Sequence, residues 1–538
     1  MKYFRLAIAL LLAAAVCGCA TRNATSPISS DVSLTSGTVR TSARDVHGVL
    51  AFKGIPYAAP PVGDLRWRSP LPAMAWQGVL DATAFRSRCW FPPPPRGTVL
   101  PGGQGSEDCL TANVWTAARS TNEKRPVMVW IHGGGFQSGY PPPGAPATDG
   151  ARFAAKGVVL VSFNYRLGVF GFLSLPALDR EGTPSGNFGL QDQIAALKWV
   201  RANIVQFGGD PGNVTIFGES AGSVSVAMLM TSPLAKGLFT RAIGESGAFC
   251  ESEFGSISTR AEAQARGQAL TDRLAHGNLA ELRAIPADTL GSATAWGLTF
   301  DPVTAAFSPS VDGFVLPDSP ANAFAQGRQI DVPLLAGWNG AEEFIFPVRV
   351  PQSSAVEFRM GAAARFGDAR IGEFLKHYPA DTDATAKLAA KMLTGDLVII
   401  EQTWEWLQLH RRTGQSPVYG YYFSYRSPYA PIPAHAVEID FVFGTLTPQR
   451  LAPGGTPPGA RDRELSDQMM SYWVNFARAG DPNGPGVPIW PRYQTDNSQV
   501  MVLDTTTAAG PESGTARFRF LQSFRKDGRL PESWRPAR

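Results

Sequence analysis

The chain has 538 residues and a formal net charge of +4, with 44% apolar and 17% charged residues. This composition is typical of a folded globular protein and excludes a largely disordered chain. The small net charge argues against nucleic acid as the main partner. The length allows one large catalytic domain or about three small domains.

The N-terminus has the features of a targeting signal. Lys2 and Arg5 precede an apolar run, Leu6–Val16, that is too short to anchor stably across a bilayer. The run leads into a stretch that resembles a bacterial lipoprotein signal with Cys19 as the lipidated residue; an ordinary secretion signal is the alternative. We expect residues 1–18 to be removed and residues 19–37 to form a flexible tether. The chain is then exported to the periplasm, to the outer membrane as a lipoprotein, or out of the cell.

Export permits disulfide bonds among the cysteines that remain. Besides Cys17 and Cys19 the chain has Cys89, Cys109 and Cys250. Cys89 and Cys109 enclose a loop rich in Pro and Gly, which favours a disulfide between them, and Cys250 is expected to be a buried free thiol. No Cys/His cluster has metal-ligand spacing, so no metal site is predicted.

Strand and helix patterns alternate along the first half of the chain. Short apolar runs predict strands, and the spacing of Leu190, Ile194 and Leu197 predicts a helix. The expected elements in chain order are strands at 112–115, 127–131 and 158–164, a helix at 187–203, and strands at 214–217 and 241–244. Alternation of this kind predicts an α/β fold with a doubly wound, mainly parallel sheet.

The second half contains two blocks without strand rhythm, at about residues 251–330 and 350–415. Both are rich in helix-forming residues and are predicted to be helical insertions that cover one end of the sheet. Further strands are expected at 332–337, 418–425 and 500–503, and a C-terminal helix at 466–479. We predict a single catalytic domain, residues 38–538.

The stretch Val214–Met228 carries the first sign of chemistry. A predicted strand runs into Gly218-Glu219-Ser220-Ala221-Gly222 and then into a predicted helix. This is the strand-turn-helix context of a G-x-S-x-G nucleophile elbow, in which the glycines relieve close contacts and the serine is exposed above the sheet. Ser220 is the predicted nucleophile; a tight turn with a solvated serine is the alternative.

A nucleophilic serine needs a base, and six histidines are available. His435 follows a Pro-rich loop and comes after the elbow, where the third triad member of such folds is found. Each of the other five is better explained as a surface, core or loop residue: His47, His132, His276, His377 and His410.

The base needs a carboxylate to orient it. Glu342 follows the predicted strand at 332–337 and is our choice, with Glu343 as the runner-up. The order Ser220, Glu342, His435 is the order of α/β-hydrolases.

An oxyanion intermediate needs backbone N–H donors. The run His132-Gly133-Gly134-Gly135 can turn its amides inward, and the elbow adds the amide after the nucleophile. We predict an oxyanion hole made by Gly134, Gly135 and Ala221. No nucleotide-binding glycine pattern is present, and no cofactor is predicted.

Several longer segments identify a family. They are GIPYAAPPVGDLRW (54–67), SEDCL (106–110), WIHGGGF (130–136), NYRLGVFGFLS (164–174), GNFGLQDQIAALKWVRANIVQFGGDPGNVTIFGESAGS (186–223) and HAVEIDFVFG (435–444). On these segments the chain resembles the type-B carboxylesterases, which include cholinesterases and bacterial para-nitrobenzyl esterases.

The resemblance implies an α/β-hydrolase fold with a Ser220, Glu342 and His435 triad. It also implies the same oxyanion hole, a disulfide between Cys89 and Cys109, and buried polar positions at Glu219, Ser246 and Glu438. The family usually has Glu-Gly at the acid, where this chain has Glu342-Glu343. After Trp90 the loop to Cys109 has no tryptophan that could serve as a platform for a quaternary ammonium group, which argues against a cholinesterase.

The expected function is hydrolysis of small-molecule carboxylic esters through an acyl-enzyme. Hydrolysis of an amide or carbamate by the same triad is one alternative, and a non-catalytic binding protein of this fold is another. Aromatic and apolar residues beside the oxyanion loop and the acid are expected to line the pocket, with an ordinary core role as the alternative; these are Phe136, Trp338, Ile345 and Phe346. The substrate and the oligomeric state are left open.

Overall fold

The computed structural model describes residues 27–91, 105–139, 146–249, 257–294, 307–346, 348, 350–446 and 456–525. The predicted signal peptide, the lipidation site Cys19, the thiol Cys250 and the side chain of Ile345 lie outside the described residues.

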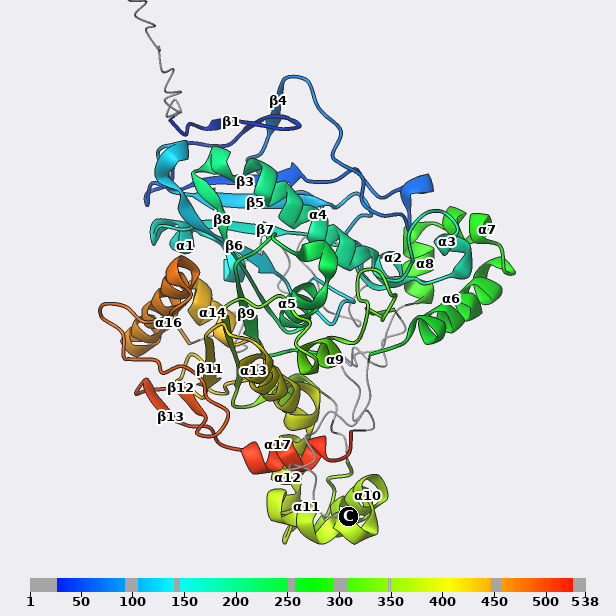
Figure 1. The fold of residues 1–538 in the computed structure, drawn as a ribbon, viewed down its shortest axis with the longest axis vertical. Helices are drawn as coiled ribbons and strands as arrows, with labels where there is room; N and C mark the ends of the chain where they lie inside the picture. Colours follow the sequence, from blue (N-terminus) through cyan, green and yellow to red (C-terminus); the bar gives the residue numbers. More distant parts are fainter. Residues whose placement is uncertain are drawn as a thin grey trace, which may run out of the picture.

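One large sheet organises the described part of the chain (Figure 1). Its order is β13-β12-β11-β10-β9-β8-β6-β7-β5-β3. In this order the strands from β12 to β7 run parallel to one another, whereas β13 at one edge and β5 and β3 at the other pair antiparallel with their neighbours. The mainly parallel sheet predicted from the alternating pattern is therefore confirmed. The strands of this sheet are β3 (Leu50–Pro56), β5 (Thr111–Thr116), β6 (Arg125–Ile131), β7 (Val159–Phe163), β8 (Gly209–Glu219), β9 (Arg241–Glu245), β10 (Leu334–Asn339), β11 (Val418–Phe423), β12 (Gln499–Leu503) and β13 (Ala508–Pro511).

The parallel register brings several strand ends together. Ile131 at the end of β6 pairs with Gly218, and Glu219 at the end of β8 pairs with Glu245 at the end of β9. Glu245 in turn lies in register with Gly337 of β10. Because the carboxyl ends of these strands share one edge, the residues that follow them meet there.

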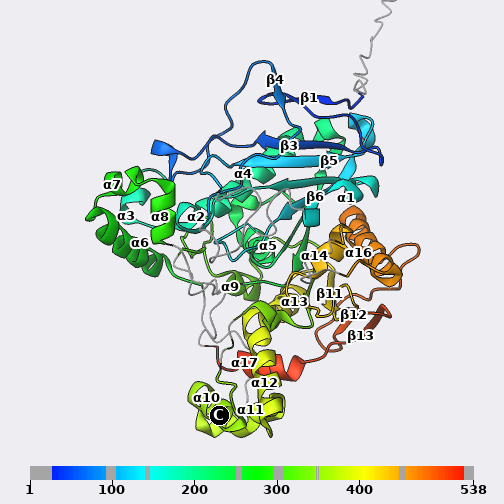
Figure 2. The same ribbon diagram turned by 180° about the vertical axis from the view of Figure 1, so that it is seen from behind.

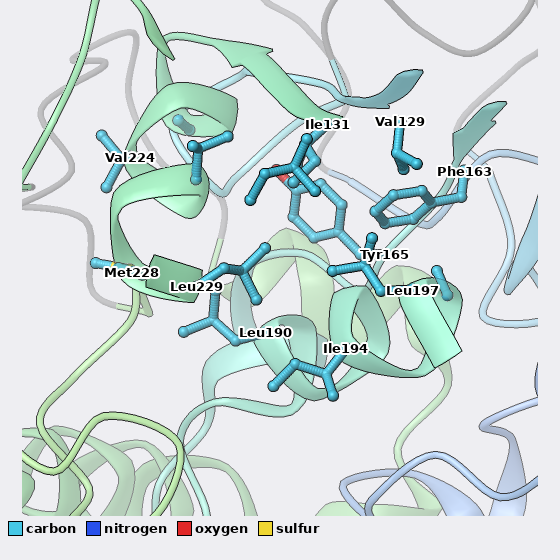
Figure 3. Packing of buried hydrophobic residues seen from close by; sticks show 14 of the residues in the cluster. Val129, Ile131, Phe163, Tyr165, Leu190, Ile194, Leu197, Val224, Met228 and Leu229 are labelled. Carbon is cyan, nitrogen blue, oxygen red and sulfur yellow. The ribbon is translucent and has the colours of Figure 1, made fainter. Parts of the chain in front are cut away.

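Each face of the sheet is covered by its own helices. In β6, Val129 and Ile131 point toward α4 (Phe188–Asn203) and α5 (Ala221–Thr231), as Figure 3 shows. Met128 and Trp130 point to the opposite face, covered by α1 (Ala151–Ala155), α14 (Glu438–Phe443) and α16 (Ala460–Ala479). Side chains alternate along a strand, so an unbroken apolar run marks a strand buried on both faces.

Helices between the later strands form two peripheral groups (Figures 1 and 2). The first is α6 (Arg260–Ala275), α7 (Leu279–Ala284) and α8 (Ala287–Ala293). The second is α10 (Ala355–Phe366), α11 (Ile371–His377) and α12 (Asp383–Gly395), joined by α17 (Thr515–Gln522). Two further helices are not peripheral: α13 (Glu401–Thr413) packs on β10 and β11, and α9 (Pro320–Ala325) contacts α5 and α13. Short helices α2 (Gly168–Phe172) and α3 (Pro176–Asp179) precede α4.

A small separate sheet changes the expectation for the N-terminal tether. Strands β1 (Asp31–Leu34), β2 (Gly37–Arg40) and β4 (Val79–Asp81) form it, so the end of the predicted tether is a strand. Val32 pairs with Val39, and both are buried. Burial of these apolar side chains favours the hairpin over a solvated linker.

A disulfide joins Cys89 to Cys109, as predicted. It ties the segment before β5 to the edge at which the parallel strands end, because Ala112 of β5 lies in register with Phe163 at the end of β7. Within the described ranges, no helix combines the length and apolarity needed to cross a membrane.

Candidate active site

Ser220 occupies the turn between β8 and α5. Its backbone has φ 56° and ψ −124°, a conformation that residues other than glycine rarely adopt. The turn is held by the Ser220 N–H, which donates to the Glu245 carbonyl over 2.8 Å. A strained serine at the end of a central strand is the geometry of a nucleophile elbow.

The two glycines of the elbow are required by close contacts. A Cβ on Gly218 would lie 2.5 Å from the Ile131 carbonyl oxygen, and a Cβ on Gly222 would overlap the same carbonyl. Strand β6 therefore approaches the elbow so closely that side chains at these two positions are excluded. The steric reason expected from the sequence is the one found.

The glycine loop after β6 lies against the elbow. A Cβ on Gly133 would lie 2.7 Å from the Glu219 carbonyl oxygen and 3.1 Å from Cβ of Ser220. Gly134 and Gly135 have φ of 107° and 62°, which turns the loop sharply beside the serine. Among the described residues, the N–H groups of Gly134, Gly135 and Ala221 have no acceptor. Such free donors are what an oxyanion requires.

His435 and Glu342 are in contact. Nδ1 of His435 lies 2.6 Å from Oε2 of Glu342, and the other oxygen, Oε1, accepts the Asn339 N–H over 2.6 Å. The two loops are joined by the Ala341 N–H, which donates to Pro433 O over 2.9 Å. Of the two neighbouring glutamates, Glu342 meets the imidazole. Glu343 is half-buried, and burial followed by the charge of Glu342 raises its pKa.

The second imidazole nitrogen faces the elbow. Nε2 of His435 lies 3.1 Å from Oε1 of Glu219, the residue directly before Ser220. The fold thus brings His435, which lies far downstream in the sequence, to the turn that holds Ser220. The ring of Phe346 packs against it, with centroids 5.2 Å apart. His435 is only 7% exposed, so its proton exchange takes place in a largely dry site.

Three buried glutamates act on this imidazole, Glu219, Glu342 and Glu438, and a fourth, Glu245, interacts with Glu438 and Glu219. Ser246 Oγ donates to Glu438 over 3.3 Å, and the Asn339 amide donates both to Glu438 and, over 2.8 Å, to Ala434 O. Trp473 Nε1 donates to Glu245 over 2.8 Å. Because these carboxyl groups share one low-dielectric region, their proton affinities depend on one another.

Burial and charge pull the pKa of His435 in opposite directions. Burial alone lowers it, but the carboxylates of Glu219, Glu342 and Glu438 outweigh burial and raise the pKa from 6.5 to about 9. Burial, and then the charge of Glu342, raise the pKa of Glu438 to about 7. Burial also raises the pKa of Glu245 well above its ordinary value. The cluster therefore stabilises an imidazolium, the species formed when a base removes the serine proton.

Two members of this cluster, Asn339 and Glu245, were not singled out in the sequence. Both are fully buried, and each is the last residue of its strand, Asn339 in β10 and Glu245 in β9. A polar residue at the carboxyl end of a predicted parallel strand is the signal that could have found them.

The predicted pocket residues whose side chains the structure describes, Phe136, Trp338 and Phe346, are all buried. Phe136 is fully buried and packs on Phe172 with ring centroids 5.4 Å apart, and Trp338 is 3% exposed against Phe518. Phe346 contacts His435. His132 stacks on Tyr165 with centroids 4.3 Å apart, and burial lowers its pKa to about 4. His132 thus packs within the glycine loop, in line with the structural role expected for it.

In the part of the chain that the structure describes, no three His, Cys, Asp or Glu side chains are grouped in a way that could hold a metal ion.

Comparison with known proteins identifies relatives over almost the whole chain. A family model described as the carboxylesterase family matches residues 29–521. The chain is 37% identical over 494 residues to the para-nitrobenzyl esterase of Bacillus subtilis (strain 168), covering 87% of this chain and 94% of that protein. It is 36% identical over 500 residues to the fumonisin B1 esterase of Sphingopyxis macrogoltabida, covering 90% and 88%. A solved structure of a PNB esterase superposes with a TM-score of 0.77 at 33% identity, covering 91% of this chain and 99% of the other.

Proposed function

Because this chain belongs to the carboxylesterase family, we propose that it hydrolyses small-molecule carboxylic esters through an acyl-enzyme formed on Ser220. The contact that carries the proposal is the 2.6 Å approach of His435 Nδ1 to Glu342, with Nε2 turned to the elbow. This arrangement supports His435 as general base and Glu342 as the carboxylate that orients it.

In the first half of the reaction, His435 Nε2 removes the Ser220 proton as Oγ attacks the ester carbonyl carbon. The carbonyl oxygen becomes an oxyanion, which accepts hydrogen bonds from the N–H groups of Gly134, Gly135 and Ala221. The imidazolium then gives its proton to the leaving alcohol as the C–O bond breaks.

In the second half, His435 takes a proton from water, which attacks the acyl-enzyme. Collapse of the second oxyanion releases the carboxylic acid, and the proton returns to Ser220 Oγ. Glu219 and Glu438 support the positively charged imidazole in both halves, since their carboxylates raise its pKa.

The proposal also includes the location of the protein in the cell. The N-terminal pattern supports export, with Cys19 as a lipid attachment point. Mass spectrometry of the mature N-terminus tests it: a lipidated Cys19 is expected, and an unmodified N-terminus at another residue contradicts it.

A panel of chromogenic esters of increasing acyl length tests the reaction. Ser220→Ala and His435→Ala are each expected to lower kcat by about 10⁴-fold or more, with unchanged thermal unfolding. A fluorophosphonate should label the wild type and not Ser220→Ala. Ester hydrolysis that survives Ser220→Ala would overturn the proposal, and faster turnover of a matched amide would reassign the substrate class.

A further inference from the structure

A groove with a volume of about 520 Å³ lies along α4, outside the candidate active site. Its walls are α4, the turn between β1 and β2, and the loop at residues 69–73, with single residues from elsewhere in the chain: Tyr57, Thr183, Leu234 and Phe314. None of the residues assigned to the nucleophile, base, acid or oxyanion hole lines it. The volume falls in the range of small-molecule sites, about 300–1,000 Å³.

The floor of the groove is apolar. Ile194, Ala195 and Trp199 of α4 line it, together with Leu71 and Phe314. Ile194 and Trp199 are buried, whereas Leu71 is 49% exposed at the rim. An apolar rim that is open to solvent beside a buried apolar floor favours a ligand with a hydrocarbon body.

The polar groups of the groove favour an anionic head. Lys198 is exposed on α4, and no carboxylate among the described residues lies within ion-pairing distance of it. Asp and Glu are absent from the residues that line the groove in the described part of the chain. Lys198 is therefore the charged side chain of the described lining, without a competing carboxylate there.

A second polar group lies two helical turns away on the same helix. Gln191 is 6% exposed, and its Nε2 has no hydrogen-bond acceptor among the described residues. A buried donor without an acceptor is unfavourable, and a ligand oxygen that enters this end of the groove would relieve it. Seven residues of α-helix place Gln191 and Lys198 about 10 Å apart along the axis.

We propose that the groove along α4 is a second binding site that takes an elongated amphiphilic carboxylate. The ligand carboxylate forms an ion pair with Lys198, and the hydrocarbon chain covers Ala195 and Leu71. An oxygen at the other end of the ligand accepts a hydrogen bond from Nε2 of Gln191. The site is non-covalent and is separate from ester hydrolysis.

Calorimetric titration of the full chain with a matched ligand series tests the site. The series is 10-hydroxydecanoate, decanoate, which lacks the far oxygen, and 1,10-decanediol, which lacks the charge. The expected order of affinity is the order given. A diol that binds as tightly as 10-hydroxydecanoate overturns the anionic part of the proposal, and no saturable binding of any ligand overturns the whole.

Variants locate the binding. Lys198→Glu is expected to lower the affinity for 10-hydroxydecanoate by about five- to tenfold, since it replaces an attractive charge by a repulsive one. Ala202→Trp, at an exposed position in the groove, is expected to abolish binding by filling it. Lys387→Glu, at an exposed position on α12, is the matched charge control and should bind as the wild type does.

Ester kinetics separate this groove from the active site. Both groove variants are expected to keep the wild-type kcat and KM for a short chromogenic ester. If both variants also keep wild-type affinity for 10-hydroxydecanoate, the ligand binds elsewhere and the proposal fails. Calorimetry does not depend on turnover, so this outcome is independent of whether ester hydrolysis itself is found.

Discussion

The elbow and the carboxylate cluster meet at His435, but they are built in different ways. The elbow is one continuous stretch, β8 to α5, shaped by backbone contacts with Ile131. The cluster takes its glutamates from the ends of β8 and β9, the turn after β10 and the start of α14. The position of Ser220 is thus a local steric property, whereas the charge state of His435 is a property of the whole fold.

This difference predicts separable effects of substitution. Changes in the cluster should alter ionisation and catalysis while the chain remains folded. Changes at the two elbow glycines should alter stability first. The three substitutions below test that separation, beginning with the largest expected effect.

Glu342→Gln should lower kcat by about 10³–10⁴-fold, because an amide does not hold the imidazole in the required tautomer or stabilise its charge. Glu343→Gln is the matched control and should retain nearly full activity, since Glu343 does not contact the imidazole. Steady-state ester kinetics and thermal unfolding measure both. If Glu343→Gln were inactive and Glu342→Gln remained active, Glu343 and not Glu342 would be the carboxylate that orients His435.

Gly222→Ala should lower the free energy of unfolding by about 3 kcal/mol, because its Cβ would overlap the Ile131 carbonyl. Gly372→Ala is the control: it lies in α11 with no heavy atom near its Cβ position, and helix propensity should stabilise it by about 0.5–1 kcal/mol. Urea unfolding measures both. If the Gly222→Ala variant were as stable as the wild type, backbone crowding would not shape the elbow.

Glu219→Gln should move the pH dependence of kcat/KM. His435 acts as a base only when neutral, so activity rises with pH through its pKa, which is raised to about 9. Removal of the Glu219 charge makes protonation less favourable, lowers that pKa and shifts the rising limb to lower pH. Glu343→Gln should leave the limb in place. An unmoved limb in Glu219→Gln would mean that this carboxylate does not act on the imidazole.

Much of the site was readable before the structure, because it rests on short-range rules. Glycines at 218 and 222 beside a serine, between a strand and a helix, indicate one kind of turn. His435 followed from elimination among six histidines and from chain order. The choice between Glu342 and Glu343 rested on motif register alone, since adjacent residues point in different directions and only the packed turn decides which one reaches the imidazole.

Other features had no local signature. Asn339 and Glu245 gain their surroundings from parallel pairing between strands far apart in the chain. The first strand, β1, lies in a stretch rich in Ser and Thr that reads as a tether, and only its pairing with β2 buries Val32. The groove along α4 is likewise lined by residues from seven separate stretches of the chain, so no single stretch of sequence predicts it.

The amino-acid sequence by itself determined the alternation of strands and helices, the turn that holds Ser220, and the family to which the chain belongs, because periodicity, glycine placement and motif spacing act over a few residues. Only the tertiary structure decided which glutamate meets His435, how many carboxylates share its surroundings, and where a second groove opens. Electrostatic and cavity properties depend on distances through space, and those distances exist only once the chain has folded.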